Sequence, residues 1–133
     1  MPLEDPERAA DELERAVHEL GCVGAFVNCY PNIGDVNTAR YLDEPETAPF
    51  WEQLEELDVP VYIHPRTPQP DQQRIYRGYD SLVGDAWGFN AETAIVGLRL
   101  MLSGLFDRHP RVNVVIGHMG ELLPLMLPAL SCV

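Results

Sequence analysis

The stretch Val59-Pro60-Val61-Tyr62-Ile63-His64-Pro65-Arg66 decides the fold. Its first five residues are hydrophobic or proline and rich in β-branched side chains, and a polar side chain, His64, follows at once. A short continuous run of this kind, bounded by polar and Gly/Pro positions, predicts a buried strand of the sort found in parallel sheets. We therefore expect a strand from Val59 to Ile63, covered on both faces.

Two similar runs lie on either side of this strand, and a helical pattern precedes each of the three. Strands are predicted over Val23 to Val27 and over Val112 to Ile116. The first helix is expected to have Asp5 as its N-cap and Pro6 at its first position, and to end at Gly21.

Three further helices are expected. The second begins near Pro45 and carries an apolar face formed by Phe50, Trp51, Leu54 and Leu57. The third runs from a cap at Asn90 to a stop at Pro110, and a fourth begins near Gly120.

Short hydrophobic strands that alternate with helices indicate an α/β fold with parallel strands and crossover helices. Residues 1–133 are predicted to form a single domain, either part of an open doubly wound sheet or part of a (β/α) barrel. The two long connections, 28–44 and 65–89, follow the C-terminal ends of strands. This is the edge at which both architectures build active sites.

Composition excludes several classes of partner. The formal net charge is -12, from 21 acidic and nine basic residues. Such a surface repels phosphate and anionic lipid, so neither nucleic acid nor membrane is an expected partner. The longest apolar candidate, Ala94 to Phe106, is too short to span a bilayer and contains Arg99. The first residues lack the pattern of a signal peptide, which predicts a cytoplasmic protein.

The three cysteines are odd in number and form no C-x-x-C pair. They therefore suggest neither a disulfide framework nor a thiolate zinc site. We expect Cys22, Cys29 and Cys132 to be buried thiols.

Polar side chains stand at or just beyond the ends of the three predicted strands. Asn28 closes the first, His64 the second, and His118 follows the third. Because parallel strands end at one edge of a sheet, these side chains should be neighbours. Two imidazoles at such an edge suit a divalent metal, although a complete site needs about four ligands. Arg66, directly after His64, could face a carboxylate substrate, or form a surface ion pair.

Glu121, three residues after His118, could accept a hydrogen bond from its imidazole and fix the tautomer. It could equally be an acidic residue in the first turn of a helix, stabilised by the helix dipole. His18 and His109 are expected to be exposed. The sequence contains no G-x-G-x-x-G, Walker loop or G-x-S-x-G motif, so dinucleotide, nucleoside triphosphate and serine-hydrolase functions have no motif behind them.

Three segments together resemble the amidohydrolase-related decarboxylases, above all the γ-resorcylate and 2,3-dihydroxybenzoate decarboxylases. They are Leu57 to Arg66, Ser103 to Pro110 (Ser-Gly-Leu-Phe-Asp-Arg-His-Pro) and Gly117 to Glu121 (Gly-His-Met-Gly-Glu). Their order and spacing agree over almost the whole chain, from about Leu3 to Leu125.

The resemblance implies a TIM barrel that binds one zinc or manganese ion and decarboxylates a small aromatic carboxylate, as part of a homo-oligomer. It identifies His64 as a metal ligand, His118 and Glu121 as a catalytic pair beside the metal, and Asn28 as a residue of the substrate pocket. The remaining family ligands, an early Glu-x-His pair and a late Asp, are not in this sequence, which supplies about three of eight strands.

Two alternatives to decarboxylation stay open. One is hydrolysis or hydration by a related member of the superfamily, with His118 as the base. The other is a non-catalytic fragment whose unpaired strand edges promote association.

Overall fold

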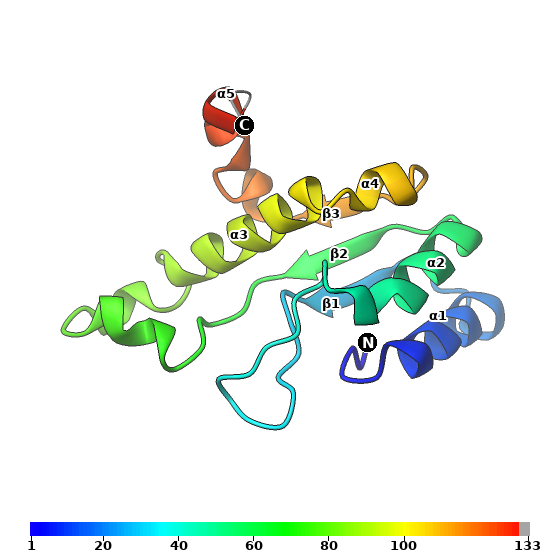
Figure 1. Cartoon of the computed structure of the whole chain (residues 1–133), viewed down its shortest axis with the longest axis horizontal. Helices are drawn as coiled ribbons and strands as arrows, with labels where there is room; N and C mark the ends of the chain where they lie inside the picture. Colours follow the sequence, from blue (N-terminus) through cyan, green and yellow to red (C-terminus); the bar gives the residue numbers. More distant parts are fainter. Residues whose placement is uncertain (131–133) are drawn as a thin grey trace.

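A computed structural model describes residues 1–130, and it contains three parallel strands with helices packed against them (Figure 1). The strands lie side by side in the order β1, β2, β3. Their bounds are Ala25–Asn28 for β1, Val61–His64 for β2 and Val114–Ile116 for β3. The helices are α1 (Pro6–Leu20), α2 (Ala48–Leu57), α3 (Gly88–Leu102), α4 (Leu105–Arg108) and α5 (Leu123–Leu130). The predicted α/β class and parallel strands are confirmed.

Helix α1 begins and ends as the sequence predicts. The side chain of Asp5 accepts a hydrogen bond from the backbone N–H of Arg8 at 3.2 Å, and Pro6 occupies the first helical position. The helix ends at Gly21, whose φ of 71° places it in the left-handed region that glycine adopts without strain.

The strands begin about two residues later than predicted. Val23 lies outside β1 and is 84% exposed. Pairing starts where the N–H of Ala25 donates to the carbonyl of Pro60 at 2.9 Å. The preceding residue, Gly24, lies so close to this carbonyl that a Cβ there would stand 2.8 Å from the oxygen. Close approach of the two backbones at Gly24 therefore marks where the ladder begins.

The helices cover one face of the sheet only. Alternate strand residues such as Val27, Val61 and Ile63 are buried in a core shared with all of α1 to α4. On the other face Phe26 is 56% exposed and Val115 is 43% exposed. The prediction of burial on both faces is wrong for the described residues, because no helix among them covers this second face.

The third and fourth helices differ from their predicted bounds. α3 begins at Gly88, not after a cap at Asn90, and it makes no side-chain cap hydrogen bond. It ends at Leu102 because Gly104, with φ of 74°, turns the chain before the short α4. The fourth predicted helix begins at Leu123, since the residues before it have left-handed backbone conformations.

The cysteine prediction is partly right. Cys29 is buried, Cys22 is exposed, and Cys132 lies outside the described residues. Within residues 1–130, no helix has the length and apolar character needed to cross a membrane.

His109 is not exposed, contrary to expectation. Its side chain is 13% exposed, and its Nδ1 lies 3.1 Å from the carboxylate of Glu55 near the end of α2. The same carboxylate accepts a hydrogen bond from the backbone N–H of Arg111 at 3.2 Å. Glu55 therefore ties α2 to the segment that leads into β3. His18 is exposed, as predicted.

Leu54→Ala should lower the free energy of unfolding by about 2–5 kcal/mol, because Leu54 has no exposed surface and the substitution leaves a cavity. Leu20→Ala is the matched control, since Leu20 is also helical but 61% exposed. Denaturant unfolding followed by circular dichroism measures both. Equal losses for the two variants would contradict the assignment of the core.

Glu55→Gln should remove a pH-dependent part of the stability. The backbone N–H of Arg111, followed by His109, lowers the pKa of Glu55 below its ordinary value of 4.5. A carboxyl whose pKa is lowered by folding stabilises the fold fully above the unfolded pKa, and this contribution disappears as the pH falls through the folded pKa. The stability difference between the parent chain and Glu55→Gln should thus be constant above about pH 4.5 and shrink below it, as urea unfolding at several pH values would show.

Candidate active site

The C-terminal edge of the sheet brings the predicted site residues together. Asn28 and His64 are Cα partners at the ends of β1 and β2, and both are on the exposed side of the strands. Ile63 pairs with Ile116, the last residue of β3. The residues that follow these two, His64 and Gly117, therefore lie side by side. His118 is one residue further on. The predicted grouping of three strand-end residues is therefore present in the fold.

The backbone that carries His118 is strained. His118, Met119, Glu121 and Leu122 have φ values of 46°, 60°, 50° and 68°, and Gly120 has 82°. The left-handed region costs about 1 kcal/mol or more for each non-glycine residue, and such residues cluster at functional sites. Glu121 consequently lies in this turn and not in the first turn of a helix.

His118 and Glu121 form a close pair. Nδ1 of His118 lies 2.5 Å from Oε1 of Glu121. The Glu121 side chain is fully buried, whereas that of His118 is 57% exposed. A carboxylate at Nδ1 fixes the ring orientation and leaves Nε2 as the nitrogen available to a substrate. The other carboxylate oxygen, Oε2, is buried and has no hydrogen-bond partner within the described residues.

A buried polar cluster lies behind the strand ends. The thiol of Cys29 donates to the carbonyl of His64 at 3.4 Å and lies 3.5 Å from the hydroxyl of Thr93. Burial raises the pKa of Cys29 to about 11, so this thiol is protonated and unreactive at neutral pH. Burial also raises the pKa of Tyr30 and of Glu92, and the Glu92 carboxylate raises that of Tyr30 further. Of these groups, Cys29 contacts the backbone of His64 directly, through the hydrogen bond to its carbonyl.

Arg66 connects the two long segments that follow β1 and β2. Its guanidinium donates to the carbonyl of Tyr30 at 2.6 Å and to the side chain of Asn32, and it lies 5.0 Å from the centre of the Tyr30 ring. The hydroxyl of Tyr30 donates in turn to the carbonyl of Thr67 at 3.0 Å. Substrate binding by Arg66 stays a prediction, and in this structure its contacts brace the two segments.

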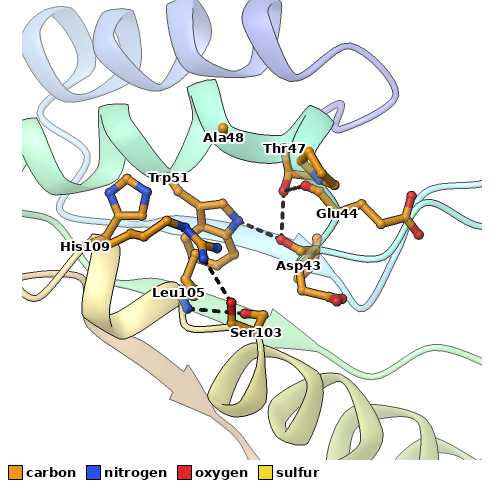
Figure 2. Close-up of a pocket in the computed structure, with 11 residues that line it drawn as sticks. Asp43, Glu44, Thr47, Ala48, Trp51, Ser103, Leu105 and His109 are labelled. Atoms are coloured by element: carbon orange, nitrogen blue, oxygen red, sulfur yellow. Dashed lines mark hydrogen bonds between the residues drawn. The ribbon is translucent and has the colours of Figure 1, made fainter.

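A separate cavity of about 370 Å³ lies on the helical side, between α2, α4 and residues 42–45 (Figure 2). There the indole N–H of Trp51 donates to the carbonyl of Leu42 at 2.7 Å. None of the strand-end residues lines this cavity. It therefore does not extend the candidate active site.

The described residues do not contain a complete metal site. No group of three or more His, Cys, Asp or Glu residues that could hold a metal ion is found in residues 1–130. His64 stands at the strand end as a single imidazole, with Asn28 opposite it. A complete zinc or manganese ligand set is thus not contained in these residues.

Comparison with known proteins places this strand-end arrangement in one family. The amidohydrolase family model matches residues 1–131. The chain belongs to the amidohydrolase family.

Among curated relatives, this amidohydrolase chain is 54% identical over 127 residues to γ-resorcylate decarboxylase of Rhizobium sp. strain MTP-10005. It is 52% identical over 130 residues to the same enzyme of Rhodococcus jostii. These alignments cover 96% of this chain but only 39% and 40% of the relatives. The chain therefore spans about two fifths of the length of the relatives it matches.

Solved structures of similar enzymes share the fold of this amidohydrolase chain. It superimposes on 2,6-dihydroxybenzoate decarboxylase in complex with 2,6-dihydroxybenzoate with a TM-score of 0.93 and 54% identity, covering 96% of this chain and 39% of that one. A second match is the manganese-bound dihydroxybenzoic acid decarboxylase of Polaromonas sp. JS666 with the inhibitor 2-nitroresorcinol. Its TM-score is 0.91 and its sequence identity 50%, and the match covers 95% of this chain and 38% of that one. The predicted partial barrel is confirmed.

Several residues of the site region escaped the sequence analysis. Tyr30 and Cys29 directly follow Asn28, so their place after a strand end was a usable signal. Glu92 lies inside α3, where a single acidic residue is ordinarily solvent-exposed, and nothing in the sequence marks it as buried.

Arg66→Ala should loosen the two segments that it joins, because charged hydrogen bonds of this kind contribute about 1.5–3 kcal/mol. Chymotrypsin should then cleave within residues 65–79 several-fold faster than in the parent chain. Arg66→Lys should give an intermediate rate, since lysine lacks the planar fork. The exposed Arg77→Ala is the control, and equal acceleration by it would show that Arg66 does not brace the segments.

Proposed function

We propose that this chain is the middle part of a metal-dependent decarboxylase that acts on a hydroxybenzoate-type aromatic acid. The observation that carries the proposal is the His118–Glu121 pair at the same sheet edge as His64, within a chain 54% identical to γ-resorcylate decarboxylase. Similar decarboxylases have been solved with manganese and either 2-nitroresorcinol or 4-hydroxy-3-methoxy-5-nitrobenzoic acid. These ligands support a carboxylate-bearing phenol as the substrate class.

Each site residue has a role in this proposal. His64 is one ligand of a divalent cation, zinc or manganese, whose charge stabilises negative charge on the substrate oxygens when it is bound. Asn28 lines the substrate pocket beside His64. Arg66 reaches the substrate carboxylate or, as its observed contacts favour, braces the loops around it.

His118 and Glu121 are the residues that position the substrate or exchange a proton with it. Decarboxylation replaces the carboxylate on the ring carbon with a proton and releases carbon dioxide, so a proton must be held near that carbon. Glu121 holds the Nδ1 side of His118, which leaves Nε2 to orient the substrate or to exchange a proton with it. Substitution of a positioned acid–base residue typically slows the reaction by about 10²–10⁴.

A second candidate function is hydration. The chain is 29% identical over 123 residues to the 2-keto-4-carboxy-3-hexenedioate hydratase of Sphingobium sp.. In that case His118 would be the base that activates water. The higher identity to decarboxylases favours the first candidate.

The complete enzyme is proposed to be a cytoplasmic homo-oligomer. Its binding partner is a small aromatic carboxylate, and neither nucleic acid nor membrane has a role.

A chimera tests the proposal directly. Residues 1–130 replace the matching segment of the Rhizobium γ-resorcylate decarboxylase, so that the relative supplies the other strands and ligands. With manganese, the chimera should release carbon dioxide from 2,6-dihydroxybenzoate. His64→Ala should abolish stoichiometric metal by elemental analysis, and His118→Ala should lower kcat by about 10²–10⁴ without metal loss. His18→Ala, on the exposed side of α1, is the matched control.

A folded, metal-loaded chimera that hydrates an unsaturated keto acid and releases no carbon dioxide would favour the second candidate. The isolated chain should bind divalent metal weakly and show no turnover, because its described residues supply one metal-binding imidazole. Stoichiometric metal in the isolated chain, lost on His64→Ala, would contradict that expectation.

A further inference from the structure

Two aromatic side chains on the exposed face of the sheet connect the two histidines of the candidate site. Phe26 and Tyr62 are Cα partners in adjacent strands, and their rings stack with centroids 5.3 Å apart and planes 2° apart. Phe26 also contacts the imidazole of His64, with a centroid distance of 5.0 Å. A continuous row of rings therefore runs from His64 through Phe26 to Tyr62.

The far end of this row presses against the backbone next to His118. A Cβ at Gly117 would lie 2.1 Å from the hydroxyl oxygen of Tyr62 and 3.1 Å from its Cζ. The φ of Gly117 is -69°, which any residue can adopt. A larger residue here would therefore be opposed by the space that Tyr62 occupies and not by the backbone conformation.

Gly117 is the joint between the sheet and the turn that bears the catalytic pair. The last paired residue of β3 is Ile116, and the left-handed residues begin at His118. Across this joint the carbonyl of Gly117 accepts a hydrogen bond from the N–H of Gly120 at 2.8 Å. A side chain that packs directly on Gly117 therefore controls the angle at which the turn leaves the sheet.

We propose that Phe26 and Tyr62 are positioning residues that set the place of His118 relative to His64. Phe26 does so through its contact with the His64 ring, and Tyr62 does so through its hydroxyl against Gly117. The catalytic importance of this placement rests on the proposed function, whereas the ring contacts and the packing on Gly117 are independent of it. The stack is well suited to this task because aromatic pairs have defined geometry and few rotatable bonds.

The Tyr62 hydroxyl acts here by its volume. It makes no hydrogen bond to another residue in the described part of the chain. Tyr62→Phe therefore removes the atom nearest Gly117 without leaving a described polar group unpaired. This makes a compensation experiment possible.

Gly117→Ala should displace the turn, because a methyl group cannot lie 2.1 Å from the Tyr62 oxygen. The measurement is a long-range ¹H–¹⁵N correlation spectrum of the histidine rings in the ¹⁵N-labelled chain, without metal or substrate. The His118 ring signals should shift and lose the pattern of an Nδ1-bonded tautomer. Those of His18 and His109 should stay in place and show that the fold is intact.

Adding Tyr62→Phe to Gly117→Ala should bring the His118 ring signals most of the way back to their positions in the parent chain, because the colliding oxygen is gone. Tyr79→Phe added to Gly117→Ala is the matched control, because Tyr79 is 69% exposed and the three atoms nearest a Cβ at Gly117 all belong to Tyr62. Unmoved His118 signals in Gly117→Ala, or equal recovery with either tyrosine substitution, would overturn the proposal.

A second variant keeps the test decisive if Gly117→Ala does not fold, as loss of the His109 signals would reveal. Phe26→Leu removes the ring that joins the two histidines but keeps an apolar side chain. It should shift the ring signals of both His64 and His118, whereas Phe106→Leu on α4 should shift neither. No shift in Phe26→Leu would refute the proposal. Because these spectra need no turnover, an inactive chimera and a failed compensation are separate results.

Discussion

Hydrogen bonding along both edges of β2 is the constraint on which the rest of this structure depends. The central strand pairs with β1 over Ala25 to Asn28 and with β3 over Val114 to Ile116. Because both ladders are parallel and share one strand, they fix where all three strands end. A shift of one residue in either ladder would turn the strand's side chains to the opposite face. The register thus sets which polar groups face the open side together.

One face of the sheet carries the apolar core, and the other carries the candidate site residues. The helical side holds the apolar core, and it also holds the buried Cys29–Thr93 contact that supports the carbonyl of His64. The open side carries Asn28, His64 and the aromatic row. Since the core packs entirely on one side, site residues on the other side can be polar and exposed without weakening it.

The turn after β3 combines strain with support. Left-handed residues from His118 to Leu122 are unfavourable on their own, but Glu121 is buried and holds His118. Its remaining oxygen has no partner among the described residues, a costly arrangement for a buried carboxylate. The Tyr62 side chain, from the central strand, packs against Gly117 at the start of this turn. The His118–Glu121 pair therefore depends on one contact within the turn and on one packing contact from a separate strand.

The sequence by itself determined the class of fold, the order of its elements and the residues at the strand ends. Hydrophobic runs and helix caps such as Asp5 and Gly21 are local signals, because they reflect the conformational preferences of a few neighbouring residues. The ends of the hydrophobic runs identified Asn28 and His64 as strand-end residues. The resemblance then assigned different expected roles to His64, a metal ligand, and His118, a member of a catalytic pair.

Only the tertiary structure decided the partners of these residues. It determined that Glu121 is fully buried against His118, that Arg66 is bonded across two loops, and that the Tyr62 hydroxyl lies against Gly117. It also determined that Glu92 is buried and that His109 pairs with Glu55. The His118–Glu121 hydrogen bond lies within one turn, and its spacing made it a candidate from the sequence; only the burial of Glu121 needed the fold. The other contacts join separate elements, and no local pattern of sequence specifies the distance at which two such elements meet.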